Sequence, residues 1–327
     1  MTEERILTYW QALNEAIRME MRRDNRVFVM GEDVAGAAGK ESEGLVDAWG
    51  GPFGVTRGLI QEFGADRVRD TPISEAGFIG AAVGAAETGL RPWVDLMFTH
   101  FAGVAWDQIS NKLAREHFYT NGQARLPVTI KTFGSCYSPF IHMPGLRCVA
   151  PSNPYNAKGL MIAAMRDDNP VIVFDNLALL RLRMHVPEED YVIPIGQSDI
   201  ARVGKDATLI GISAMTGVCL LAADRLAKDG IEVEVIDLLS LEPLDEATLI
   251  SSVKRTKRVA IVDQDHPHCG MASYLAALLG QRVFDFLDAP IATITPPNAP
   301  EPMNHLLDAG YLPTVDRVVE AVRELLT

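Results

Sequence analysis

The sequence is poor in several features that mark large classes of protein. Its four cysteines include no CxxC pair, so their spacing suits neither a zinc site nor a disulfide framework and fits a reducing cytosol. Positive charge is scarce, because 30 Lys and Arg face 43 Asp and Glu and leave a net charge of −13. Binding to phosphate backbones needs clustered basic residues, so we expect no nucleic acid partner.

Long apolar stretches are also missing. The longest runs, such as Val171–Phe174, are far too short to span a bilayer, and the charged N-terminus lacks the apolar core of a signal peptide. We therefore predict a cytoplasmic protein with no membrane partner, or a mitochondrial matrix protein, freed of its transit peptide, if the source is eukaryotic.

The common self-contained catalytic motifs are absent from the sequence. There is no Walker phosphate loop, no GxGxxG after a strand, no HExxH zinc motif and no GxSxG nucleophile elbow. An enzymatic function must therefore rest on other residues.

The sequence does contain apolar runs of strand length that alternate with segments of helix length. In the first half we expect helices at 6–21, 56–63, 79–86 and 106–118, strands at 27–30, 93–98 and 128–131, and a loop over 34–54. In the second half we expect strands at 148–152, 171–175, 207–213, 233–240, 258–264 and 291–295, with helices at 159–165, 218–228, 247–253 and 272–279. Such alternation predicts an α/β fold of parallel sheets covered by helices.

The length of 327 residues suggests about two domains. The polar, proline-containing segment 181–196 is the best candidate for the boundary between them. We predict a first domain over 1–185, a linker over 186–200 and a smaller α/β domain over 201–327.

One acidic residue stands at the head of a predicted helix. Glu75 follows Pro72 in the segment Asp70–Gly80 (DTPISEAGFIG) and precedes a run of small residues. A carboxylate there is favoured by the positive end of the helix dipole. Spacing alone favours a helix-capping role over a catalytic one.

The segment around Glu75 also carries a resemblance to a known family. DTPISEAGFIGAAVGAAETGLRP closely resembles the signature of the beta subunits of thiamine-diphosphate-dependent 2-oxo acid dehydrogenases. Ordered matches cover nearly the whole chain: GEDV (31–34), FGVTRGL (53–59), DQISN (107–111), PGLRCVAPSNPYNAKGL (144–160), VPEEDYVIPIG (186–196) and PLDEATL (243–249). DAWGG (47–51) and VDQDHPHCGMA (262–272) look most like the acetoin dehydrogenase branch.

The resemblance implies a pyrimidine-binding thiamine domain followed by a transketolase C-terminal domain. It implies thiamine diphosphate shared with an alpha subunit that holds the diphosphate and Mg²⁺, in an α2β2 heterotetramer. It also implies transfer of an acyl group to a lipoyl-bearing acyltransferase core protein.

The resemblance assigns roles to individual residues. Glu75 matches the glutamate that hydrogen-bonds the aminopyrimidine ring, which supports formation of the thiazolium ylid. Glu32 matches a second carboxylate facing the cofactor, and its alternative is an exposed turn residue. Phe101 matches an aromatic packed on the pyrimidine, or ordinary core, and Ile73 and Phe118 match lining residues.

Two further assignments follow from the resemblance. The family often holds a monovalent cation such as K⁺ by main-chain carbonyls, here those of Val128, Ala164, Met165, Asp167 and Asn169. His100 neighbours Phe101 and is a candidate for the pocket, although a satisfied core histidine is the commoner role for such a residue.

One departure from the family pattern affects the chemistry. Relatives carry a QHSQ-type loop whose histidine donates and accepts protons near the reacting carbon. Here the stretch from Lys131 to His142 is about a dozen residues shorter and contains no such motif. Either a mobile loop is missing between Tyr137 and Ser138, or the loop is deleted and its proton group comes from His100 or the alpha subunit.

Two alternative functions keep the same fold. A split transketolase would move a ketol unit between sugars, and the short loop would leave room for a larger substrate. A degenerate subunit would only scaffold its alpha partner. Retention of Glu75 argues against degeneracy, and loss of the loop argues for it.

Overall fold

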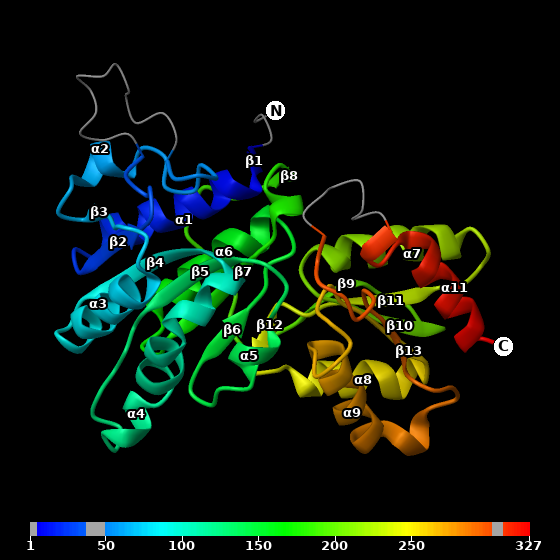
Figure 1. Cartoon of the computed structure of the whole chain (residues 1–327). Helices are drawn as coiled ribbons and strands as arrows, with labels where there is room; N and C mark the ends of the chain where they lie inside the picture. Colours follow the sequence, from blue (N-terminus) through cyan, green and yellow to red (C-terminus); the bar gives the residue numbers. More distant parts are fainter. Residues whose placement is uncertain (1–4, 37–49, 303–309) are drawn as a thin grey trace. The chain divides into compact units, whose positions relative to one another are not determined.

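The computed structural model describes residues 5–36, 50–302 and 310–327 and divides into two compact α/β units (Figure 1). The first unit spans Met1–Gly134 and Phe140–Ile195, and the second spans Ser135–Pro139 and Gly196–Thr327. Most of the loop predicted over 34–54, including Asp47 of the DAWGG segment, lies outside the described residues.

A parallel sheet organises the first unit. Its strands lie in the order β6-β7-β5-β4-β2-β3, and each neighbouring pair is parallel. The strands of the unit are β1 (Ile6–Thr8), β2 (Val27–Gly31), β3 (Val68–Asp70), β4 (Arg91–Phe98), β5 (Thr129–Phe133), β6 (Arg147–Val149), β7 (Val171–Asp175) and β8 (Arg183–His185).

Helices cover this sheet, and α1 packs along α6. They are α1 (Tyr9–Arg23), α2 (Leu59–Phe63), α3 (Glu75–Glu87), η2 (Thr99–Ala105), η3 (Gln108–Leu113), α4 (Glu116–Tyr119), α6 (Pro154–Arg166) and η4 (Leu177–Leu179). Strands β2, β5 and β7 are buried at every residue, as expected for parallel strands covered on both faces. The carboxyl ends of parallel strands share one edge, where ligands bind in α/β sheets.

The N-terminal helix begins later than its apolar spacing predicts. Residues 6–8 form β1, which pairs antiparallel with β8. The helix starts at Tyr9 because Thr8 and Gln11 form a capping box. The expectation of a helix from Ile6 was therefore wrong in its first turn.

The predicted helix over 106–118 is also interrupted. Gln108–Leu113 is a π-helical turn, followed by the short helix α4. The amide of Ala114 donates to the carbonyl of Ile109, five residues back, which is the signature of a π-bulge. Apolar spacing does not encode such a bulge.

The second unit has its own sheet, in the order β14-β13-β10-β11-β9, in which only β9 is antiparallel to its neighbour. Its core lies between this sheet and helices α7 and α11. Its elements are β9 (Asp199–Arg202), β10 (Ala207–Gly211), α7 (Ala214–Ala227), β11 (Val233–Asp237), β12 (Ser240–Glu242), α8 (Glu246–Thr256), β13 (Val259–Val262), α9 (Met271–Val283), η5 (Phe284–Phe286), β14 (Ala292–Ile294) and α11 (Val315–Leu325). Helix α5 (Ser138–Ile141) begins in the 135–139 segment.

The α/β class predicted from the sequence is confirmed by these two parallel sheets. Among the described residues, no helix combines the length and apolar character needed to cross a bilayer.

Candidate active site

Two carboxylates meet at the carboxyl edge of the first sheet. Glu32 follows the last residue of β2, and Glu75 is the first residue of α3. The side chain of Glu75 is only 9% exposed. Gly31 lets the strands approach here, because a Cβ at this position would lie 2.7 Å from the carbonyl oxygen of Asp95.

The environment of Glu32 disfavours its charged form. Burial raises the pKa of the Glu32 carboxyl, and the charges of Glu75, Asp33 and Asp95 raise that pKa further. Its Oε1 is buried and has no hydrogen-bond partner among the residues that the structure describes. Buried polar atoms are nearly always paired, so this oxygen is suited to a donor on a bound molecule.

Phe101 lies on η2, an element that packs against α3, the helix that Glu75 begins. Its ring meets Phe98 edge to face with centroids 5.7 Å apart, yet 37% of Phe101 is exposed. His100, beside it, is exposed.

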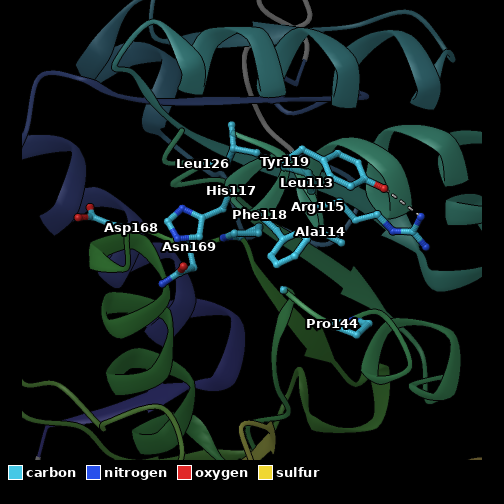
Figure 2. A pocket seen from close by; sticks show the side chains of 12 residues that line it. Leu113, Ala114, Arg115, His117, Phe118, Tyr119, Leu126, Pro144, Asp168 and Asn169 are labelled. Carbon is cyan, nitrogen blue, oxygen red and sulfur yellow. Dashed lines mark hydrogen bonds between the residues drawn. The ribbon is translucent and has the colours of Figure 1, made fainter. Parts of the chain in front are cut away.

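Ile73 and Phe118, the other predicted lining residues, lie on the surface of the isolated chain. They are 84% and 83% exposed. Phe118 lines a cavity of about 510 Å³ that also involves Leu113, Leu126, Pro144 and Asn169 (Figure 2). Neither Glu32, Glu75 nor Phe101 lines this cavity. The role of Phe118 toward a cofactor therefore stays a prediction.

Four of the five carbonyls assigned to a cation already accept protein hydrogen bonds. Arg91, a largely buried residue, donates from Nε to the Met165 carbonyl at 3.1 Å and from a terminal nitrogen to the Asp167 carbonyl at 2.5 Å. The Val128 carbonyl accepts from the Val171 amide, and the Ala164 carbonyl accepts from the Asp167 amide. K⁺ at this position stays a prediction.

Hydrogen bonds hold the short stretch after β5. Within the second unit, Ser138 Oγ donates to Asp265 Oδ2 at 2.6 Å, and Ser135 Oγ donates to the Gln264 carbonyl at 3.3 Å. Burial raises the pKa of the neighbouring Cys136 thiol to about 11, so this cysteine is not a thiolate at neutral pH. The short connection is anchored by hydrogen bonds, and it carries no histidine.

A buried cluster of charges beside Glu32 was not predicted from the sequence. Lys131 is fully buried, and its ammonium lies 3.4 Å from both carboxylate oxygens of Asp95 and 3.9 Å from Asp175 Oδ2. Burial raises the pKa of Asp175 to about 7, although Lys131 and the Tyr9 hydroxyl oppose this rise. The only sequence signal was an ionisable residue inside each of three apolar strands.

Metal-binding potential within the described ranges is low. No group of three or more His, Cys, Asp or Glu side chains there is arranged to hold a metal ion.

Comparison with known proteins shows the family of the chain. Residues 6–181 match the family model described as "Transketolase, pyrimidine binding domain", and residues 196–318 match "Transketolase, C-terminal domain". A solved structure titled "Split gene transketolase, inactive beta4 tetramer" superposes with a TM-score of 0.76 over 98% of both chains, at 19% identity. At that identity the likeness shows the shared fold alone.

Two curated relatives are much more similar in sequence. "Acetoin:2,6-dichlorophenolindophenol oxidoreductase subunit beta" of Bacillus subtilis (strain 168) is 45% identical, and the match covers 98% of each chain. "Pyruvate dehydrogenase E1 component subunit beta" of Rickettsia felis is 40% identical, again over 98% of each chain. The resemblance found in the sequence is confirmed: this chain belongs to the family of beta subunits of thiamine-diphosphate-dependent acetoin and 2-oxo acid dehydrogenases.

Proposed function

We propose that the chain is the beta subunit of a dehydrogenase that, with an alpha subunit and thiamine diphosphate, cleaves acetoin or a 2-oxo acid. The acyl group then passes to a lipoyl-bearing acyltransferase core protein. The observation that carries the proposal is the pair Glu32 and Glu75, brought together at the sheet edge with one buried, unpaired oxygen.

The residues present fit the aminopyrimidine end of thiamine diphosphate. The bound cofactor supplies a carbanion at its thiazolium carbon. Glu75, at the positive end of α3, would hold a proton between its carboxyl group and a ring nitrogen of the pyrimidine. Glu32 Oε1 would accept from a donor on the ring, and Phe101 would pack on the ring face.

The proposal of an alpha subunit is supported by large apolar side chains that this chain exposes. Ile73, immediately before α3, and Phe118 present large apolar side chains to solvent in the isolated chain. Exposed apolar surface of this kind is typical of a partner-binding face. In this proposal the alpha subunit covers that face and supplies the Mg²⁺ and diphosphate site, in an α2β2 assembly.

The sequence relationship favours a dehydrogenase over a ketol transferase. The curated dehydrogenase subunits are 45% and 40% identical to the chain, whereas the split transketolase structure is 19% identical. On the alternative that the loop is deleted, the acid–base role of the family histidine falls to His100 or the alpha subunit.

The test is activity of the chain co-purified with its alpha subunit. Thiamine-dependent dye reduction by acetoin or pyruvate is expected for the wild-type complex. Glu75→Gln should lower kcat by at least about 100-fold, because proton transfer contributes roughly 10²–10⁴ to such rates. Glu87→Gln, at the exposed far end of the same helix, is the matched control and should keep full activity.

Two results would contradict the proposal. One is a wild-type complex that binds thiamine diphosphate but turns over neither substrate, which would indicate a scaffold. The other is Glu75→Gln activity equal to that of Glu87→Gln.

A further inference from the structure

A backbone irregularity lies beside the two glutamates. In the pairing of β4 with β5, Asp95 is opposite Lys131, but Met97 is opposite Thr132, so β4 contains one extra residue. Met97 has φ of 65°, a left-handed conformation that is unfavourable for a side chain of this kind. Such bulges next to active sites redirect the side chains that follow.

Asp95 holds this bulge in place. Its Oδ1 accepts the Met97 amide at 2.8 Å, and its side chain is buried. The hydrogen bond ties the carboxylate to the backbone amide of the residue in the left-handed conformation. A strained conformation persists only where its surroundings determine it, and Asp95 provides that constraint.

Lys131 holds Asp95 in turn. Its ammonium lies 3.4 Å from both Asp95 oxygens and 3.4 Å from the centre of the Phe133 ring. On its other side stands Asp175, whose Oδ1 accepts from the Tyr9 hydroxyl at 3.0 Å. The lysine is fully buried, so neither carboxylate can exchange it for water without opening the core.

The bulge sets the direction of the aromatic side chains after it. Phe98 packs edge to face on Phe53, with centroids 5.9 Å apart, and on Phe101, with centroids 5.7 Å apart. Phe101 lies on η2, which packs against the helix begun by Glu75. Removing the extra residue from β4 would turn every later side chain of the strand to the opposite face.

We propose that Asp95 and Lys131 are positioning residues for the thiamine site. Asp95 stabilises the bulge at Met97, and this bulge sets the direction of Phe98 and Phe101. Lys131 in turn holds the Asp95 carboxylate in position. This inference rests on the proposed function, because it has Phe101, which Phe98 supports, pack on the aminopyrimidine ring.

The experiment measures the Kd of thiamine diphosphate by calorimetry on the purified alpha–beta complex with Mg²⁺. Asp95→Ala should weaken binding by about tenfold or more, because it removes the acceptor of the Met97 amide and so the constraint on the backbone that precedes Phe98 and Phe101. Asp95→Asn should weaken it less, since its amide oxygen still accepts from the Met97 amide. Lys131→Met should weaken binding, whereas the exposed Lys205→Met is the matched control and should not.

A second substitution distinguishes loss of positioning from a general loss of stability in Asp95→Ala. Glycine adopts a positive φ without cost. Met97→Gly added to Asp95→Ala should therefore recover part of the lost affinity, whereas an unrelated loss of stability would not respond.

Hydrogen exchange of the wild-type chain adds a readout that needs neither cofactor nor variants. The Met97 amide should be protected as strongly as its β4 neighbours, and rapid exchange there would overturn the proposal. Wild-type affinity in both Asp95→Ala and Lys131→Met would also overturn it. A wild-type complex that binds no thiamine diphosphate would instead remove the proposed function and this inference with it.

Discussion

Both units bury acidic residues within or directly after their central strands, but these residues have different partners. In the second unit, Asp263 accepts the backbone amides of Asp265 and Ala272, and Asp237 accepts from the Thr216 hydroxyl. In the first unit, Asp95 and Asp175 face the buried ammonium of Lys131. No lysine or arginine is buried in the second unit, as far as the described residues extend.

The comparison distinguishes buried carboxylates whose partners belong to the protein from a buried carboxylate that is available to a ligand. Neutral amide and hydroxyl donors hold the aspartates of the second unit in place. In the first unit, Glu32 still has an unpaired buried oxygen beside an ion cluster. A buried oxygen that lacks a donor is suited to a donor group on a bound molecule.

The largest expected effect breaks the ion cluster of the first unit. Lys131→Met leaves buried carboxylates without their cation, and such losses cost about 3–5 kcal/mol of unfolding free energy. Denaturant unfolding should show this loss in the first unit. Arg225→Met, which removes a cation paired with exposed Asp316 in the second unit, should cost under about 1 kcal/mol. Equal effects from the two variants would contradict the comparison.

A second effect concerns pH. The pKa of Asp175 is raised from 3.8 to about 7 by burial, so the unfolded chain releases this proton at lower pH than the folded chain. The stabilising contribution of the protonated group is complete below about pH 4 and is lost as pH rises through 7. Asp175→Asn should therefore show a flatter decline of stability between pH 4 and 7. An unchanged slope would mean that Asp175 ionises normally.

Asp263 offers the corresponding test in the second unit. Burial raises its pKa to about 7 as well, but two backbone amides donate to its carboxylate. Asp263→Asn should destabilise the chain at every pH, because its amide group cannot accept from both donors in the same way. A purely pH-dependent effect would show that these amide bonds contribute little.

The smallest effect lies in the short segment after β5. Ser138→Ala removes the hydroxyl that donates to Asp265 and should cost about 1 kcal/mol. Ser251→Ala, on the exposed face of α8, is the control and should be neutral. No difference between the two variants would mean that this segment is not anchored through Ser138.

Much of the fold could be predicted because apolar runs of strand length alternate with segments of helix length along the sequence. The apolar run at 171–175 is a strand at those residues, and the strand predicted over 207–213 extends as far as Gly211. The start of α1 was missed because β1 depends on pairing with β8, which is remote in the sequence. Glu75 was found through the family signature, since its spacing alone favoured a cap. Lys131 was missed because a charged residue in a strand is ordinarily expected to face solvent.

The pairing of β1 with β8 joins the beginning and the end of the first unit. Arg5 donates to the carbonyls of Val186 and Pro187, and Lys158 binds the carbonyls of residues 187–189. The polar segment 181–196, predicted as the domain boundary, therefore accepts hydrogen bonds from Arg5 and Lys158 of the first unit. A unit whose beginning and end are held together in this way is suited to circular permutation, with new termini opened at an exposed turn such as Asn121–Gly122.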